Sequence, residues 1–128
     1  MPEITAKHMG DMKFEALVGN HKLIIDVPPE MNGKDRGPTA PELFITSLAS
    51  CIAVYATSAC KNAGIDAQGL STILSFDIFM SKLGNLKAAI KIPKEVGKRD
   101  SAILHAAKHY FIHETVRSAP AVAITLEK

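Results

Sequence analysis

Apolar and polar residues alternate in the first part of the chain with the period of two that half-buried β-strands show. The alternation predicts antiparallel strands over 4–8, 11–18 and 21–27. Gly19-Asn20 is a turn signal between the last two strands, so we expect these to form a hairpin. Pro28-Pro29 ends the third strand, and a loop is expected from there to Thr39.

A long apolar stretch follows, and it carries helix signals at both ends. Thr39 and Glu42 have the spacing of a capping box, in which each side chain satisfies a backbone N–H of the first turn. Gly64 supplies a left-handed stop. We therefore predict a helix over 40–63, about 36 Å long, that is apolar almost all round. Residues 43–60 are uncharged and just long enough to span a membrane, but their serines and threonines favour a helix buried in a globular protein.

The second half of the chain predicts a hairpin, two helices and a closing strand. The expected strands cover 71–81, 86–92 and 121–126, with a turn at 83–85 in the hairpin. The expected helices run from 98–100 to about 110 and over 113–117. Hairpins dominate and single strands do not alternate with helices. The order therefore predicts an α+β fold with antiparallel sheets rather than a doubly wound parallel sheet.

Length and charge restrict the function classes. The 128 residues predict one domain over 1–128. With 15 basic and 13 acidic residues the charges nearly balance, which excludes a nucleic-acid binder that relies on bulk charge. The N-terminus shows no secretory signal pattern and there are only two cysteines, so we expect a cytoplasmic protein with free thiols and no membrane partner.

The two cysteines fall in the predicted long helix. Cys60 follows Cys51 by nine residues, which rotates the helix by about 900° and advances it by about 13.5 Å. The thiols therefore face opposite sides, too far apart for a disulfide. Cys51 is open to two interpretations: a small buried apolar residue, or a reactive nucleophile. Cys60 is interpreted as structural or incidental.

Three histidines are spaced four residues apart. His105, His109 and His113 would form one stripe if the helix were continuous, and neutral histidines at this spacing can hold a metal ion. No Asp, Glu or Cys stands at a spacing that completes a known site. A solvated set of histidines is therefore the alternative, and no metal or other cofactor is expected.

Two charged residues flank the start of the long helix. Arg36 is either a solvated loop charge or a residue that folds over the helix start and lowers the pKa of a thiol. Glu42 is explained as the capping acid. Glu42 lies nine positions before Cys51, so along this helix it faces away from that thiol.

The run over 37–51 resembles the signature of the OsmC/Ohr family. It contains a Gly/Pro loop, a Pro-Glu-Leu helix start and an Ala-Ser-Cys triplet about ten residues on. Segments 13–16, 23–28 and 106–116 resemble further parts of the family in the same order. The resemblance implies an OsmC-like fold, with antiparallel sheets wrapped around the central helices of an intertwined homodimer. It also implies active sites at the dimer interface.

Characterised members of that family reduce organic hydroperoxides with a reactive cysteine, which matches Cys51. They then form a disulfide with a second cysteine, whose position here holds Tyr110. The resemblance implies that Tyr110 and His113 lie against Cys51. The missing second cysteine places the chain closer to the divergent OsmC-like branch.

Two further family positions also differ in this chain. The acid of the hydroperoxide-reductase branch aligns with Pro41, one residue before Glu42. No arginine stands at the position of the family's N-terminal arginine. The only arginine upstream of Cys51 is Arg36. Arg36 and Glu42 are therefore kept as candidate site-lining residues.

Two functions are compatible with the sequence. The first is a one-cysteine thiol peroxidase that reduces organic hydroperoxides in oxidative stress and is regenerated by an external thiol reductant. The second is a non-enzymatic protein that binds a small apolar ligand at the dimer interface, with Cys51 as a packed remnant. Neither function needs a cofactor.

Overall fold

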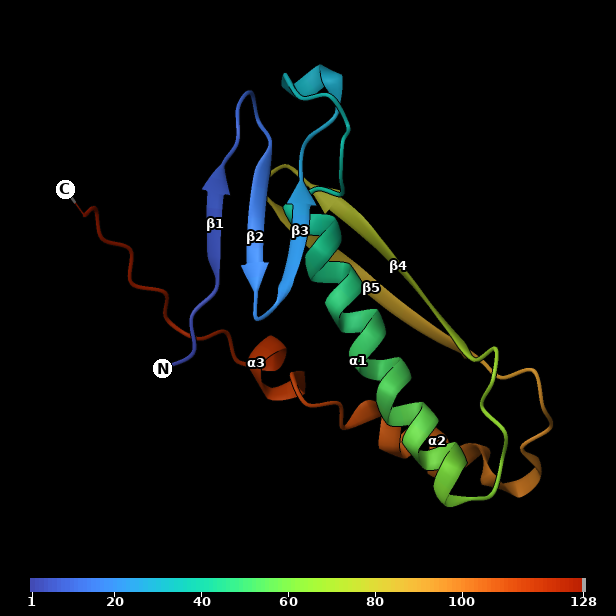
Figure 1. Cartoon of the computed structure of the whole chain (residues 1–128). Helices are drawn as coiled ribbons and strands as arrows, with labels where there is room; N and C mark the ends of the chain where they lie inside the picture. Colours follow the sequence, from blue (N-terminus) through green and yellow to red (C-terminus); the bar gives the residue numbers. More distant parts are fainter. Residues whose placement is uncertain (128) are drawn as a thin grey trace. The chain divides into compact units, whose positions relative to one another are not determined.

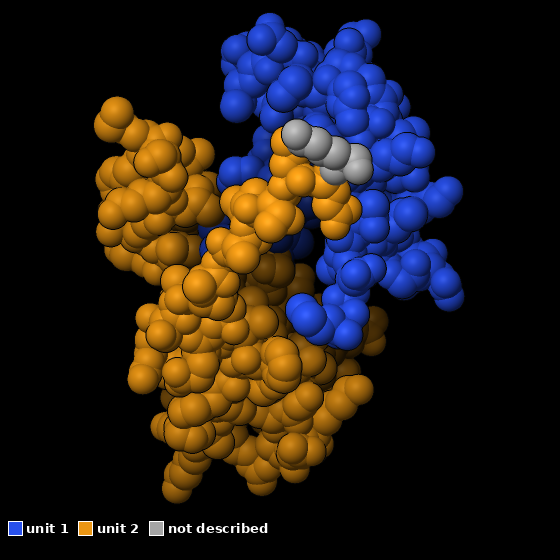
Figure 2. Space-filling view, turned by 90° about the vertical axis from the view of Figure 1, so that its left-hand side faces the viewer, with its two compact units in different colours: residues 1–46 blue, residues 47–128 orange. Residues whose placement is uncertain are grey.

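The strands of this chain pair in antiparallel fashion and occur with helices, which confirms the α+β class (Figure 1). The structure is a computed structural model, and it describes residues 1–127. Two units are distinguished, Met1–Thr46 and Ser47–Lys128, and Figure 2 colours them separately. The helix α1 (Ala40–Asn62) runs through the boundary between them.

The first unit contains a three-stranded sheet in the order β1-β2-β3. Its strands are β1 (Thr5–His8), β2 (Phe14–Val18) and β3 (His21–Ile25). Val18 pairs with His21 across the two-residue turn, and Gly19 adopts a left-handed φ of 58° there. All three predicted strands and the predicted hairpin are therefore confirmed, with shorter bounds.

The loop between β3 and α1 is packed tightly against the end of β3. It contains the short helix η1 (Pro29–Met31), followed by Asn32 in the left-handed region. A Cβ at Gly37 would collide with the carbonyl oxygen of Ile24, and one at Gly33 with that of Val27. Glycine is needed at both positions because backbone lies where a side chain would begin.

The ends of α1 follow the capping signals. The Thr39 N–H donates to Glu42 Oε1 at 2.8 Å, and the Glu42 N–H donates to Thr39 Oγ1 at 3.2 Å. At the other end Gly64 has a φ of 72°, and the Ile65 N–H donates to the Cys60 carbonyl at 2.8 Å. The predicted helix is thus confirmed to within one residue.

The second unit packs α1 and α2 (Asp100–Lys108) over a two-stranded sheet. The sheet consists of β4 (Ser71–Phe79) and β5 (Lys82–Lys91). The buried core cluster comprises Ile52, Ala56, Cys60, Ile103 and Ala107. The short helices η2 (Gly97–Arg99) and α3 (His113–Arg117) complete this part, so both predicted C-terminal helices are confirmed.

The predicted turn at 83–85 is wrong. The hairpin turns at Met80 and Ser81 instead, because Phe79 pairs with Lys82, and 83–85 lies inside β5. The register shifts between Ser75 and Asp77, which places one extra residue on β5. Asn85 takes a left-handed φ of 52° and its amide donates to Asp77 Oδ2 at 2.8 Å. Its turn propensity therefore serves a β-bulge.

The predicted closing strand over 121–126 is also wrong for the chain as described. No strand among residues 1–127 pairs with this segment. The apolar side chains of Val122, Ile124 and Leu126 are highly exposed. The alternation is present, but a strand needs a neighbouring backbone to satisfy its N–H and C=O groups.

Replacing Gly37 with alanine should destabilise the protein more than the same change at Gly19. Gly37 has a carbonyl oxygen in the way of a Cβ, whereas Gly19 has open space and only its left-handed φ to strain. We expect a cost of about 1 kcal/mol at Gly19 and more than twice that at Gly37. Urea unfolding monitored by circular dichroism measures both. Equal costs would contradict the close approach of Gly37 to β3.

Candidate functional site

Cys51 is a half-buried free thiol in the middle of α1. The buried stripe of this helix in the second unit consists of Leu48, Ile52, Ala56 and Cys60, spaced four residues apart. Cys51 lies beside that stripe rather than on it, so its sulfur is not sealed in the core. Cys60 is fully buried and free, which confirms that the two cysteines form no disulfide.

A small apolar cavity of about 150 Å³ lies against α1 in the second unit, and Cys51 is not among its lining residues. Leu48 and Ile52 contribute the helix side of its wall. The other lining residues are Leu74, Leu86, Ala88, Tyr110 and Val116. Only the Tyr110 phenol is polar among these side chains, so the cavity suits an apolar group.

Tyr110 and His113 are brought together by the connection between α2 and α3. Their rings meet edge to face, with centroids 5.4 Å apart and planes at 78°. Tyr110 also packs against the buried core cluster. The structure thus places Tyr110 on the cavity wall and His113 against Tyr110, while direct contact of either with Cys51 stays a prediction.

Arg36 forms an ion pair with a buried carboxylate that the sequence analysis missed. Its Nε donates to Asp26 Oδ2 at 2.6 Å, and its Nη1 lies 3.5 Å from Asp11 Oδ2. The Arg36 side chain is 31% exposed and is held by this ion pair rather than free in solvent. Its placement as a site-lining residue stays a prediction. The guanidinium ties the loop before α1 back to the end of β3.

Asp26 is wholly buried and its carboxylate is satisfied by several donors. Besides Arg36 Nε, the backbone N–H groups of Val27, Arg36 and Lys34 donate to it at 2.8, 3.2 and 3.4 Å. The Arg36 side chain holds the pKa of Asp26 well below its usual range, and the backbone donors add to this while burial opposes it. In turn, Asp26 raises the pKa of Arg36. The sequence signal for Asp26 was a lone acid at the end of the apolar run 23–27.

Glu42 performs the capping role that its spacing predicts. The backbone N–H and hydroxyl of Thr39 lower the pKa of Glu42 because both contacts favour the carboxylate form. The carboxylate is thereby committed to the first turn of α1. Its placement as a site-lining residue stays a prediction.

The three histidines do not form one stripe. Helix α2 ends at Lys108 and α3 begins at His113, so the chain changes direction between His109 and His113. His105 and His109 do come together, with ring centroids 4.4 Å apart. Among the described residues, no three His, Cys, Asp or Glu side chains gather as a metal site.

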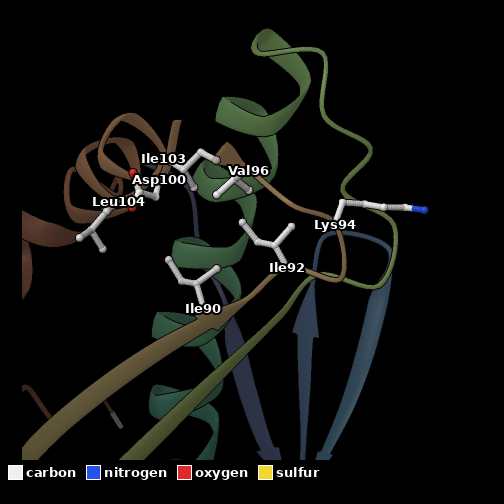
Figure 3. Close-up of a pocket in the computed structure, with 7 residues that line it drawn as sticks. All are labelled: Ile90, Ile92, Lys94, Val96, Asp100, Ile103 and Leu104. Atoms are coloured by element: carbon white, nitrogen blue, oxygen red, sulfur yellow. The ribbon is translucent and has the colours of Figure 1, made fainter. Parts of the chain in front are cut away.

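A second cavity, of about 260 Å³, lies between the end of β5 and α2 (Figure 3). Its apolar wall is made by Ile90, Ile92, Val96, Ile103 and Leu104. Asp100 and Lys94 line it as well, and Figure 3 shows the Lys94 ammonium extending away from the apolar side chains. This cavity is larger than the one lined by Tyr110.

Comparison with protein families gives one match, to a sequence model described as OsmC-like protein, over residues 33–125. The matched region includes both the Arg36 loop and the whole of α1. No curated protein matches the chain.

Solved structures with the same fold come from several bacteria. A Psychrobacter arcticus 273-4 protein assigned to osmotic stress induction and the detoxification response is 21% identical, with a TM-score of 0.79, covering 90% of this chain and 88% of that one. The organic hydroperoxide resistance protein OsmC of Legionella pneumophila is 17% identical, with a TM-score of 0.61 and coverage of 91% and 88%. An organic hydroperoxide resistance protein of Vibrio cholerae, with captopril in one active site, is 14% identical, with a TM-score of 0.59 and coverage of 93% and 87%.

Acid should weaken the fold through Asp26. The pKa of Asp26 is depressed in the folded chain, so its contribution to stability is complete above the unfolded value, near pH 4, and is lost as the pH falls below that. Asp26→Asn should lower the melting temperature at pH 7 by about 5–10 °C. The variant should also lose less stability than the native chain between pH 5 and pH 2. Parallel pH profiles measured by scanning calorimetry would contradict the assignment.

Proposed function

The chain belongs to the OsmC-like protein family, and from that premise we propose that it is a thiol-dependent peroxidase that reduces organic hydroperoxides in oxidative stress. The observation that carries the proposal is the half-buried free thiol of Cys51, whose sequence neighbour Ile52 lines a small apolar cavity. The thiol supplies a nucleophile and the cavity supplies a place for the organic group. Two structural relatives bear the description organic hydroperoxide resistance protein.

The proposed reaction has two balanced halves. The Cys51 thiolate attacks the terminal oxygen of the hydroperoxide, the O–O bond breaks, and the products are a sulfenic acid and an alkoxide that takes up a proton to become an alcohol. An external thiol then attacks the sulfenic sulfur and releases water, forming a mixed disulfide. A second thiol resolves it, which regenerates Cys51 and leaves the external reductant oxidised.

Regeneration by an external thiol follows from the positions of the two cysteines. Cys60 is fully buried and lies on the opposite side of α1, so it cannot reach a Cys51 sulfenic acid while the helix is intact. Tyr110 occupies the position of the family's second cysteine, and its phenol cannot form a disulfide. The reductant must therefore enter from outside the chain.

We further propose that the protein works as a homodimer. Large apolar side chains of the second unit are exposed, including Val54 at 61%, Ile73 at 60% and Ile78 at 72%. A second copy that covers these surfaces would remove them from water.

The helix α1 also leaves apolar residues exposed, Val54 among them. Among residues 1–127, α1 alone is long and apolar enough to cross a membrane. Within the chain, 28% of its apolar window is buried. Core helices of soluble proteins meet the same criterion of length and composition. Its polar caps and the buried stripe favour cover by protein, and the two free thiols favour a cytoplasmic location.

A second candidate function is the binding of a small apolar ligand without catalysis. It is favoured by the cavity of about 260 Å³ at the end of β5, whose wall is mostly apolar. Under this alternative, an apolar fluorescent probe would bind equally well to the native chain and to Cys51→Ser. Neither protein would consume peroxide beyond the background rate.

Cys51→Ser should abolish peroxide consumption. With cumene hydroperoxide and dihydrolipoamide, we expect a saturable rate for the native protein and a loss of at least 100-fold in the variant, because serine cannot form a sulfenic acid. Cys60→Ala serves as the matched control and should retain most of the rate. Native protein without turnover, or equal rates in Cys51→Ser, would contradict the proposal.

The solution mass should correspond to two copies. Size-exclusion chromatography with light scattering should give a mass near twice the chain mass of 13.8 kDa at micromolar concentration. A charge placed on the exposed apolar surface, as in Ile73→Lys, should shift the equilibrium toward the monomer because burying a charge is costly. Lys87→Ala, a change of an exposed polar residue on β5, is the control. A native monomer would contradict the dimer.

A further inference from the structure

We propose that His105 and His109 form a two-histidine site for a divalent transition-metal ion such as Ni²⁺ or Zn²⁺. The site lies at the C-terminal end of α2, and Cys51 is not one of its ligands. It uses none of the groups assigned to the peroxidase reaction. The proposal therefore stands or falls separately from the proposed function.

The two rings are held side by side on an exposed surface. Both residues are exposed, and their ring centroids lie 4.4 Å apart with the planes inclined by 42°. An ion that binds two imidazole nitrogens at about 2.0–2.1 Å in tetrahedral or square geometry needs those nitrogens roughly 3 Å apart. The centroid separation of 4.4 Å is within the range from which side-chain rotation can direct one nitrogen of each ring toward a shared ion.

One hydrogen bond fixes which nitrogen of His109 is free. Its Nδ1 lies 2.8 Å from the backbone carbonyl oxygen of His105. A carbonyl oxygen can only accept, so Nδ1 must carry the proton and donate it. In the neutral ring, Nε2 is then left with its lone pair. Metal-binding histidines are commonly oriented by this same donation from the second ring nitrogen to a backbone carbonyl.

The electrostatics of the helix end also favour a cation. His105 lies in the last turn of α2 and His109 is its C-cap residue, where the free carbonyl groups carry partial negative charge. Lys108 is the nearest cation in the sequence, and its long exposed side chain can move away. Because no cluster of three ligands occurs among residues 1–127, water would fill the remaining positions and the affinity would be modest.

The site stands next to a residue of the cavity wall. Tyr110 follows His109 directly, and the His113 N–H donates to the Tyr110 carbonyl at 2.9 Å. A bound ion would therefore restrain the turn between α2 and α3 that carries Tyr110. This gives the site a physical route to influence the cavity that Tyr110 lines.

Isothermal titration of the full chain with Ni²⁺ tests the site, because Ni²⁺ does not oxidise thiols. We expect one ion per chain and at least tenfold weaker binding in His105→Ala and in His109→Ala. His21→Ala removes an exposed histidine of β3, and Cys51→Ser removes the half-buried thiol. Both controls should bind as the native chain does.

Nuclear magnetic resonance of the native protein keeps the test valid if a variant fails to fold. Paramagnetic Ni²⁺ should broaden the ring signals of His105 and His109 before those of His8 and His21. Absence of binding, unchanged affinity in both histidine variants, or loss of binding in Cys51→Ser would overturn the proposal.

Discussion

The chemistry proposed for this protein depends on the continuity of α1. The helix is fixed at its start by the reciprocal bonds of Thr39 and Glu42 and at its end by the left-handed Gly64. Because it is unbroken between them, its geometry decides the chemistry: a buried stripe ends in Cys60, and Cys51 lies beside that stripe with partial access. A kink between the cysteines would remove the reason for a one-cysteine mechanism.

The features that the sequence predicts well are local. Capping signals, hairpin turns and the spacing of the cysteines involve residues within one turn or one helix, and the structure reproduces them. Asn85 was misplaced because a residue that tolerates left-handed backbone serves a turn or a bulge equally, and only the pairing with Asp77 distinguishes them. The alternating segment 121–126 could not be placed because its strand state depends on a partner that the described chain does not supply.

The candidate site shows the same division between local and long-range information. The sequence predicts the position of Cys51 on α1, because periodicity fixes the faces of a helix. The sequence does not predict the ion pair between Arg36 and Asp26, because this pair forms only when the loop after β3 returns to the end of that strand. Tyr110 joins the cavity only through the fold of the second unit, and family resemblance rather than spacing drew attention to it.

The most direct test of the central claim is site-resolved mass spectrometry of the native protein after a short pulse of cumene hydroperoxide with a sulfenic-acid trap. We expect a stoichiometric adduct on Cys51, none on Cys60, and no disulfide between them. An adduct on Cys60, a Cys51–Cys60 disulfide, or unmodified Cys51 in the presence of excess hydroperoxide would contradict it.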